Sequence, residues 1–308
     1  MSDTLARLTW LALLQAAVVG VVVLAYRAIG SPTRTEGTIA VALVLAARPL
    51  DDALVQGQVG IIVAFLVTAA LFANSRRRSA AAGSALGLAI ALKVTPLLLV
   101  AYLAWKRAWR TLAFAGAGLL VLVALTLMAG WLPRWDAYFR LLRSVGAGTP
   151  FGSNQSIDGF LLRLVLPAQD NPFQHPPGWI TGLSLALRVG IVGLVAALVL
   201  RLRSRLTEPL WLEVSIVLLA LPMLQPFAWV HHWVIALLAI PVGCRLVARS
   251  QLAPVAIAGL VAAVLFGELA AVIPDQPEIL VSTWLFSMLL AILCLGLGAR
   301  DPDPKGAG

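Results

Sequence analysis

About ten long apolar stretches, separated by short polar or basic gaps, constrain the fold of this chain more than any other feature. They lie at 9–29, 37–47, 58–73, 80–104, 112–130, 179–200, 210–228, 229–247, 252–273 and 280–299. Hydrophobic residues make up 60% of the 308 residues and charged residues only 12%, too few to cover a water-soluble globule. We therefore predict an all-α, polytopic transmembrane helical bundle that forms one integral membrane domain over residues 1–308.

The basic residues gather in the gaps between the apolar stretches, at 76–78, 106–110, 201–205 and 245–249. Basic gaps of this kind lie on the cytoplasmic side of a membrane. The pattern predicts a multi-pass protein of the bacterial plasma membrane, with an extracytoplasmic loop at 131–178 and a cytoplasmic tail at 300–308. The net charge of +9 is thereby explained, and no nucleic-acid partner is expected.

The apolar stretch 80–104 has a basic cluster at each end, which a single crossing would place on opposite sides. Lys93-Val94-Thr95-Pro96 interrupts this stretch at its middle. Proline removes a helix hydrogen bond and disfavours helix at the preceding residue. We therefore predict a broken re-entrant pair of shorter helices that meet near Lys93 and Pro96.

Lys93 is the most informative charge within an apolar stretch, because a cation at membrane depth is costly and usually faces a cavity or a partner. One interpretation is that it offsets the charge of a phosphate or of a leaving group. The other is a structural ion pair with a carboxylate such as Glu213 or Glu268.

Two neighbouring histidines, His231 and His232, lie between Trp229 and Trp233 at a predicted extracytoplasmic helix end. Adjacent helical positions diverge by about 100°, so the two imidazoles are not expected to share a metal ion. One of them is suited to bind a phosphate or to transfer a proton, while the other packs.

Group transfer to a hydroxyl usually needs a carboxylate as general base. Asp51 and Asp52 precede Gln56-Gly57-Gln58, where a span begins. Asp52 is our candidate base and Gln58 a candidate substrate contact; the alternative is that both aspartates are turn and helix-start residues.

The polar loop 131–178 carries two further candidate sites. Its first part places Trp135, Tyr138, Phe139 and Leu142 on one helical face, with Arg140 and Arg143 off that face. This pattern predicts a helix in the membrane interface whose arginines either bind a lipid phosphate or only anchor it.

The second candidate in this loop is Asn154-Gln155-Ser156, in a turn-rich stretch without apolar periodicity. Amides and hydroxyls of this kind either read sugar hydroxyls or brace the loop.

Several of these stretches, in the same order, resemble glycosyltransferase family 87 of the C-type glycosyltransferase superfamily. The motifs that carry the resemblance are Gln56-Gly57-Gln58, Arg76-Arg77-Arg78, Ala91-Leu92-Lys93-Val94-Thr95-Pro96, Asn154-Gln155-Ser156 and Trp229-Val230-His231-His232. The resemblance implies a mannosyltransferase that takes a hexose from a polyprenyl-phosphate donor and passes it to a lipid or glycan acceptor outside the membrane. It implies no metal and no other cofactor.

On this resemblance we assign the candidate residues two roles. The catalytic set is Lys93, His231, His232 and Asp52, and the substrate-binding set is Gln58, Arg140, Arg143, Asn154, Gln155 and Ser156. Membrane lipids are the remaining expected partners.

The chain departs from the family pattern in two places. Gly60 stands where the family has Asn, and the family's first extracytoplasmic loop, which holds its essential Asp, precedes the part that residue 5 onward matches. We therefore expect a truncated chain that is inactive alone. The alternative function is a non-catalytic lipid-binding or flippase-like protein, because a broken helix with a midspan charge is also typical of transporters.

Overall fold

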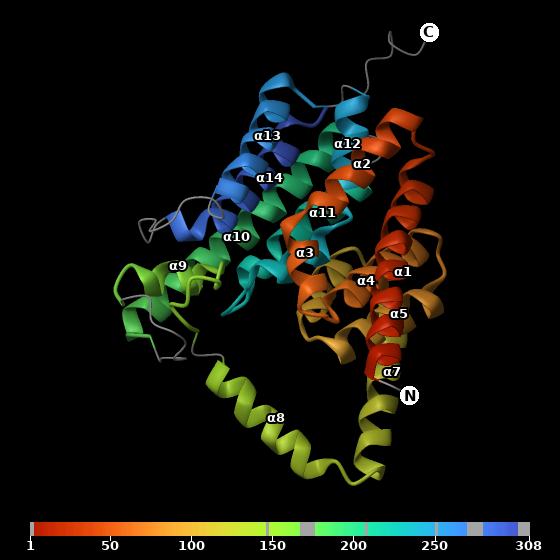
Figure 1. The fold of residues 1–308 in the computed structure, drawn as a ribbon, viewed down its shortest axis with the longest axis vertical. Helices are drawn as coiled ribbons and strands as arrows, with labels where there is room; N and C mark the ends of the chain where they lie inside the picture. Colours follow the sequence, from red (N-terminus) through yellow and green to blue (C-terminus); the bar gives the residue numbers. More distant parts are fainter. Residues whose placement is uncertain are drawn as a thin grey trace.

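The structure is a computed structural model that describes residues 3–145, 148–166, 176–206, 209–249, 252–269 and 280–300. Within these residues all regular secondary structure is helical, apart from one isolated bridge between Leu252 and Ala299 (Figure 1). The prediction of an all-α chain is confirmed. The predicted tail beyond Arg300, and residues 167–175 of the predicted loop, lie outside the described residues.

The helices follow one another along the chain with short connections. Those of the first half are α1 (Asp3–Ile29), α2 (Arg34–Ala46), α3 (Arg48–Val55), α4 (Gly60–Ser75), α5 (Ser79–Leu92), η1 (Thr95–Leu98), α6 (Leu99–Trp105), α7 (Trp109–Met128) and α8 (Leu132–Val145). Those of the second half are α9 (Ile157–Arg163), α10 (Gly178–Arg205), α11 (Leu210–Ala220), η2 (Pro222–Leu224), η3 (Val230–Ala236), α12 (Ala239–Ala248), α13 (Pro254–Leu269), η4 (Leu280–Ser282) and α14 (Thr283–Gly298).

Among the described residues, three helices are long and apolar enough to cross a membrane, namely α1, α7 and α10. The pair η3 and α12, which is bent by 58°, makes a fourth if it counts as one span. The other apolar helices have 10–17 residues, among them α4, α5, α13 and α14. A multi-pass bundle agrees with these lengths, whereas the number of about ten membrane segments stays a prediction.

The basic gaps of the sequence come together at one end of the helices. The Arg76 guanidinium donates to the Arg27 carbonyl at 3.3 Å, and Thr111 Oγ1 donates to Asn74 Oδ1 at 2.7 Å. These bonds join the carboxyl ends of α1 and α4 to the amino end of α7.

Two buried carboxylates hold further basic residues at that same end. Glu213 pairs with Lys106 at 2.9 Å and with Arg203 at 3.0 Å. Glu36 pairs with Arg245 at 3.1 Å, and Arg245 also donates to the carbonyl of Ser31, just beyond α1. The common end of the four basic clusters agrees with their predicted location on one side of the membrane.

The break predicted in the stretch 80–104 is observed at the expected residues. α5 ends at Leu92 because Lys93 is extended (φ −155°, ψ 132°), and Pro96 lies in the 3₁₀ turn η1. Gly83 of α5 faces Thr111, Phe114 and Ala115 of α7, and Gly87, one turn later, faces Ala115.

α5 and α7 therefore run side by side in the same direction. Two such helices require that the chain between them returns, so residues 93–108 lead back to the end at which α5 began. The predicted out-and-return path is thus confirmed, and both flanking basic clusters lie at one end.

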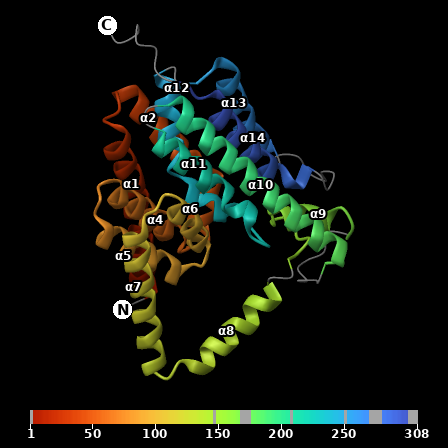
Figure 2. The same ribbon diagram turned by 180° about the vertical axis from the view of Figure 1, so that it is seen from behind.

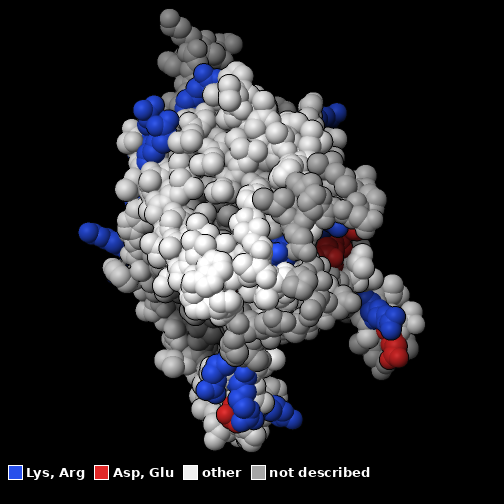
Figure 3. All heavy atoms as spheres, turned by 90° about the vertical axis from the view of Figure 1, so that its left-hand side faces the viewer, with Lys and Arg blue, Asp and Glu red and all other residues white. Residues whose placement is uncertain are grey.

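The exterior is suited to a bilayer. Figure 3 shows a broad uncharged surface, with basic side chains gathered above and below it. α7 exposes large apolar side chains along its length, including Leu120 (72%) and Met128 (84%). α8 extends from the end of α7 away from the other helices in both ribbon views (Figures 1 and 2).

The close contact of α5 with α7 generates a stability prediction. A Cβ atom on Gly83 would lie 2.4 Å from Phe114 Cβ and 2.5 Å from the Thr111 carbonyl oxygen, which cannot move freely. Gly83→Ala should lower the free energy of unfolding by roughly 1–3 kcal/mol through overpacking. The measurement is the thermal unfolding midpoint in detergent.

Gly118→Ala in α7 is the matched control, since a Cβ there meets nothing within 4 Å. The control should keep or slightly raise the midpoint because alanine favours helix. Equal midpoints for wild type and Gly83→Ala would contradict the tight α5–α7 contact.

Candidate functional site

The predicted site residues Asp52 and His231 are neighbours in the structure, although 179 positions separate them. α3 packs against η3 and brings the Asp52 carboxylate to 3.0 Å from His231 Nδ1. The His231 side chain is only 3% exposed, whereas that of Asp52 is 34% exposed. The carboxylate is therefore open to an incoming molecule and is held from behind by a buried imidazole.

The Gln-Gly-Gln turn supports the same carboxylate. Gln56 Nε2 donates to Asp52 Oδ1 at 2.8 Å, and Gln58 Nε2 donates to Gln56 Oε1 at 3.2 Å. Gly57 has φ +60°, a left-handed conformation that favours glycine, and its carbonyl accepts a bond from the Trp10 indole at 2.9 Å. Gln58 thus lies beside the open face of Asp52.

Lys93 lies next to this pair at the break between α5 and η1. Lys93, Thr95, Gly60 and His232 line a small cavity of about 10 Å³, which is enough for about one water molecule. Thr95 Oγ1 donates to Gln225 Oε1 at 3.2 Å and so joins this break to the segment before η3. Lys93 therefore belongs to the same cluster as the two histidines.

The proposed partner Glu213 was a wrong alternative for Lys93, because its carboxylate is already paired with Lys106 and Arg203. The side chain of Glu268, the other alternative, lies outside the described residues. In the part of the chain that the structure describes, no carboxylate lies within ion-pair distance of Lys93.

The amino end of α4 adds to the positive potential near Lys93. No side chain caps this helix at Val59, and the first N–H groups of a helix carry partial positive charge. A Cβ on Gly60 would lie 3.8 Å from Lys93 Nζ, so the ammonium group is close to this first turn. A cation beside a helix amino end is an arrangement that suits a phosphate.

The two imidazoles diverge as predicted. Their ring centroids lie 4.8 Å apart with planes at 80°, and while His231 contacts Asp52, His232 lines the cavity beside Lys93. The Trp229 ring is stacked against His232 at 6.5 Å between centroids. No cluster of three His, Cys, Asp or Glu side chains that fits a metal ion occurs within the described residues.

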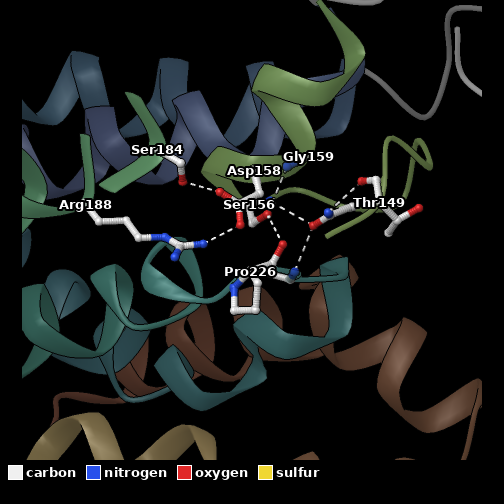
Figure 4. Close-up of polar contacts among 9 residues, drawn as sticks. Thr149, Ser156, Asp158, Gly159, Ser184, Arg188 and Pro226 are labelled. Atoms are coloured by element: carbon white, nitrogen blue, oxygen red, sulfur yellow. Dashed lines mark hydrogen bonds and ion pairs between the residues drawn. The ribbon is translucent and has the colours of Figure 1, made fainter. Parts of the chain in front are cut away.

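The side chains of Asn154, Gln155 and Ser156 are buried and bonded within the protein. Asn154 Nδ2 donates to the Thr149 carbonyl at 2.8 Å, and Ser156 Oγ donates to the Pro226 carbonyl at 3.1 Å (Figure 4). Gln155 Nε2 donates to the Gly152 and Val281 carbonyls at 2.9 and 2.6 Å. This geometry is that of a loop brace, the alternative to sugar recognition in the sequence.

Arg140 and Arg143 lie on α8, apart from the Asp52–Lys93 cluster (Figures 1 and 2). Arg140 pairs with Asp136 one turn earlier, and Arg143 Nε donates to the Phe139 carbonyl at 3.4 Å. Trp135 packs against Tyr138 and Phe139, so the predicted apolar face of the helix is present.

Sequence reasoning missed Gln225 and Arg163. Gln225 meets Thr95 across 130 positions, and the buried Arg163 donates to the carbonyls of Phe151 and Asn154 at 3.0 and 2.8 Å. An arginine inside the apolar run Leu161-Leu162-Arg163-Leu164 was the available signal, because a buried guanidinium needs several acceptors.

Comparison with known proteins identifies the relatives of this arrangement. The model described as Glycosyltransferase family 87 matches residues 1–226. The chain belongs to glycosyltransferase family 87.

Two curated relatives carry names that state their substrates. The polyprenol-phosphate-mannose-dependent alpha-(1-2)-phosphatidylinositol mannoside mannosyltransferase of Mycobacterium tuberculosis is 29% identical over 190 residues, which are 61% of this chain and 41% of that protein. The corresponding pentamannoside mannosyltransferase of Mycolicibacterium smegmatis is 28% identical over 222 residues, 71% of this chain and 51% of that protein. The chain thus spans about half the length of these relatives or less.

A solved structure also aligns with the chain. It is the crystal structure of ArnT from Cupriavidus metallidurans bound to undecaprenyl phosphate, with 18% sequence identity and a TM-score of 0.49. The alignment covers 96% of this chain and 63% of ArnT.

The pairing of Asp52 with His231 can be tested by a double-mutant cycle. Asp52→Ala, His231→Ala and the double variant should show a coupling of about 1 kcal/mol in the free energy of unfolding, because a partly exposed carboxylate bonds to a buried imidazole. Unfolding in detergent, followed by tryptophan fluorescence, supplies the values.

The matched control is the same cycle with Asp51→Ala, since the Asp51 side chain is exposed on the same helix. Its coupling with His231→Ala should be close to zero. Equal couplings in both cycles would show that the Asp52–His231 bond contributes nothing specific.

Proposed function

We propose that this protein is a polyprenyl-phosphate-dependent hexosyltransferase of the bacterial plasma membrane. It moves a hexose, with mannose as the first candidate, to a lipid or glycan acceptor on the extracytoplasmic face. The observation that carries the proposal is the juxtaposition of the Asp52–His231 pair with Lys93. This cluster lies at the ends of α4 and α5 that are opposite to the arginine-rich ends.

Asp52 is the proposed general base. Its open carboxylate accepts the proton of an acceptor hydroxyl as the hydroxyl oxygen bonds to the anomeric carbon of the sugar. The bond from that carbon to the phosphate oxygen breaks, and polyprenyl phosphate leaves with the electron pair. His231 and Gln56 each hold one carboxylate oxygen and so keep the carboxylate oriented.

Lys93 and the first turn of α4 are the proposed phosphate site. Negative charge grows on the leaving phosphate in the transition state, and a cation beside free helix N–H groups stabilises it there. Because no described carboxylate neutralises Lys93, its full charge is available to the phosphate. His232, on the wall of the same cavity, is a further contact for the phosphate oxygens.

The choice of mannose rests on the relatives, whose names state a polyprenol-phosphate-mannose donor. Arg140 and Arg143 on α8 remain proposed contacts for lipid phosphates at the membrane surface. Gln58, beside Asp52, remains a proposed sugar contact. For Asn154, Gln155 and Ser156, the occupied side chains favour a bracing role over direct contact with the sugar.

The test is sugar transfer by the purified full chain in lipid vesicles, with radiolabelled polyprenyl-phosphate mannose and a phosphatidylinositol mannoside acceptor. Asp52→Asn should lower the rate by about 10²- to 10⁴-fold, the usual contribution of a general base. Lys93→Met should lower it by about 10²- to 10³-fold, because one charge-stabilising group of the transition state is lost.

Asp51→Asn is the matched control and should transfer at close to the wild-type rate. If Asp52→Asn also keeps the wild-type rate, Asp52 is not the base. If the wild-type chain binds the donor but transfers no sugar, the enzymatic proposal fails and the lipid-binding or flippase-like alternative takes its place.

A further inference from the structure

The segment between η2 and η3 has no helical hydrogen bonds of its own, yet it leads directly into His231 and His232. Buried peptide groups need partners, and here the loop 149–156 supplies them. The Ala228 N–H donates to Asn154 Oδ1 at 2.9 Å, and the Ala228 carbonyl accepts from the Gln155 N–H at 2.6 Å. Both polar groups of Ala228 are therefore bonded to this loop.

Asn154 is the centre of this connection, and its side chain is fully buried. Its Oδ1 atom accepts from the N–H groups of Ala228 and Ser156, while its Nδ2 atom donates to the Thr149 carbonyl. Every one of these bonds requires the amide oxygen and nitrogen in their present positions, so the orientation of the amide is fixed.

The loop is itself anchored on the side away from η3. The Gln155 side chain donates to the Val281 carbonyl and accepts from the Trp284 N–H, which ties the loop to the start of α14. Arg163 of α9 donates to the Asn154 carbonyl. Asn154 is thus placed between a fixed support and the segment that carries the histidines.

Ala228 lies three residues before His231, with only one residue before η3 begins. The first bond of the 3₁₀ turn, from the His232 N–H to the Trp229 carbonyl, is 2.8 Å long. A shift of Ala228 is therefore passed on directly to the position of the His231 ring against Asp52.

We infer that Asn154 is a positioning residue, which holds the segment 226–228 in place and so sets His231 at hydrogen-bond distance from Asp52. Its importance for transfer rests on the proposed function of the Asp52–His231 pair. Its effect on the geometry of His231 does not depend on that function.

Gly159 supplies a second way to disturb the same contact. A Cβ there would lie 2.2 Å from the Asn154 carbonyl oxygen and 2.7 Å from Asn154 Cγ. Gly159→Ala therefore displaces Asn154 while every hydrogen-bonding group stays in the chain.

The experiment measures the imidazole NMR signals of the full chain in detergent after labelling of histidine. The chain has three histidines, so each signal can be assigned by one substitution. Asn154→Ala and Gly159→Ala should shift the His231 signals toward their position in Asp52→Asn, because the ring loses the same partner. Asn154→Asp keeps an accepting oxygen for the Ala228 and Ser156 N–H groups, and should leave the His231 signals close to wild type.

Ser184→Ala is the matched control. It removes a buried hydrogen bond to Asp158, the residue that also pairs with Arg188, without touching the 226–228 segment (Figure 4). The His231 signals should not move in this variant. Where Asn154→Ala does not fold, Gly159→Ala and Asn154→Asp decide in the same way.

Wild-type His231 signals in folded Asn154→Ala or Gly159→Ala would overturn the inference, as would an Asn154→Asp spectrum like that of Asp52→Asn. In the transfer assay, Asn154→Ala should lower kcat and leave the KM for the donor unchanged, with recovery in Asn154→Asp. If the wild-type chain transfers no sugar, the proposed function fails, while the histidine signals still test the role of Asn154.

Discussion

The need to bond every peptide group governs this structure. A bilayer offers no partners to backbone N–H and C=O groups, so irregular backbone persists only where other parts of the protein satisfy it. The chain leaves regular helix at Lys93–Thr95 and at Gln225–Trp229, and both departures lead to the same cluster of side chains. Thr95 and Gln225 join them, and Asn154 supplies the missing partners of the second.

Charge is arranged by the same economy at the two ends of the bundle. At the arginine-rich end, Glu213 and Glu36 are buried and fully paired, so their charges are neutralised by Lys106, Arg203 and Arg245. At the other ends of α4 and α5, Lys93 has no described carboxylate partner and lies beside the amino end of a helix. A cation kept without a counter-ion is costly, which is why such a residue marks a place for a charged ligand.

Features that depend on neighbouring residues were predictable from the sequence. Pro96 and the two basic clusters that flank 80–104 predicted both the break and the return of the chain. The spacing of Trp135, Tyr138 and Phe139 predicted the apolar face of α8. The partner of Glu213 was not predictable, because α6, α10 and α11 meet at that carboxylate from distant parts of the chain. The buried bonds of Asn154 and Gln155 were one of two readings, since the same amides suit a sugar or a backbone.

The sequence by itself determined an all-helical membrane chain, the common side of its basic clusters and the residue types able to carry transfer chemistry. These follow from hydropathy, helical periodicity and proline, which act over a few residues. Only the tertiary structure decided that Asp52, rather than Asp51, faces His231, and that Lys93 stands free beside the α4 amino end. Such choices depend on the packing of α3 against η3 and of α4 against α5, which no local pattern records.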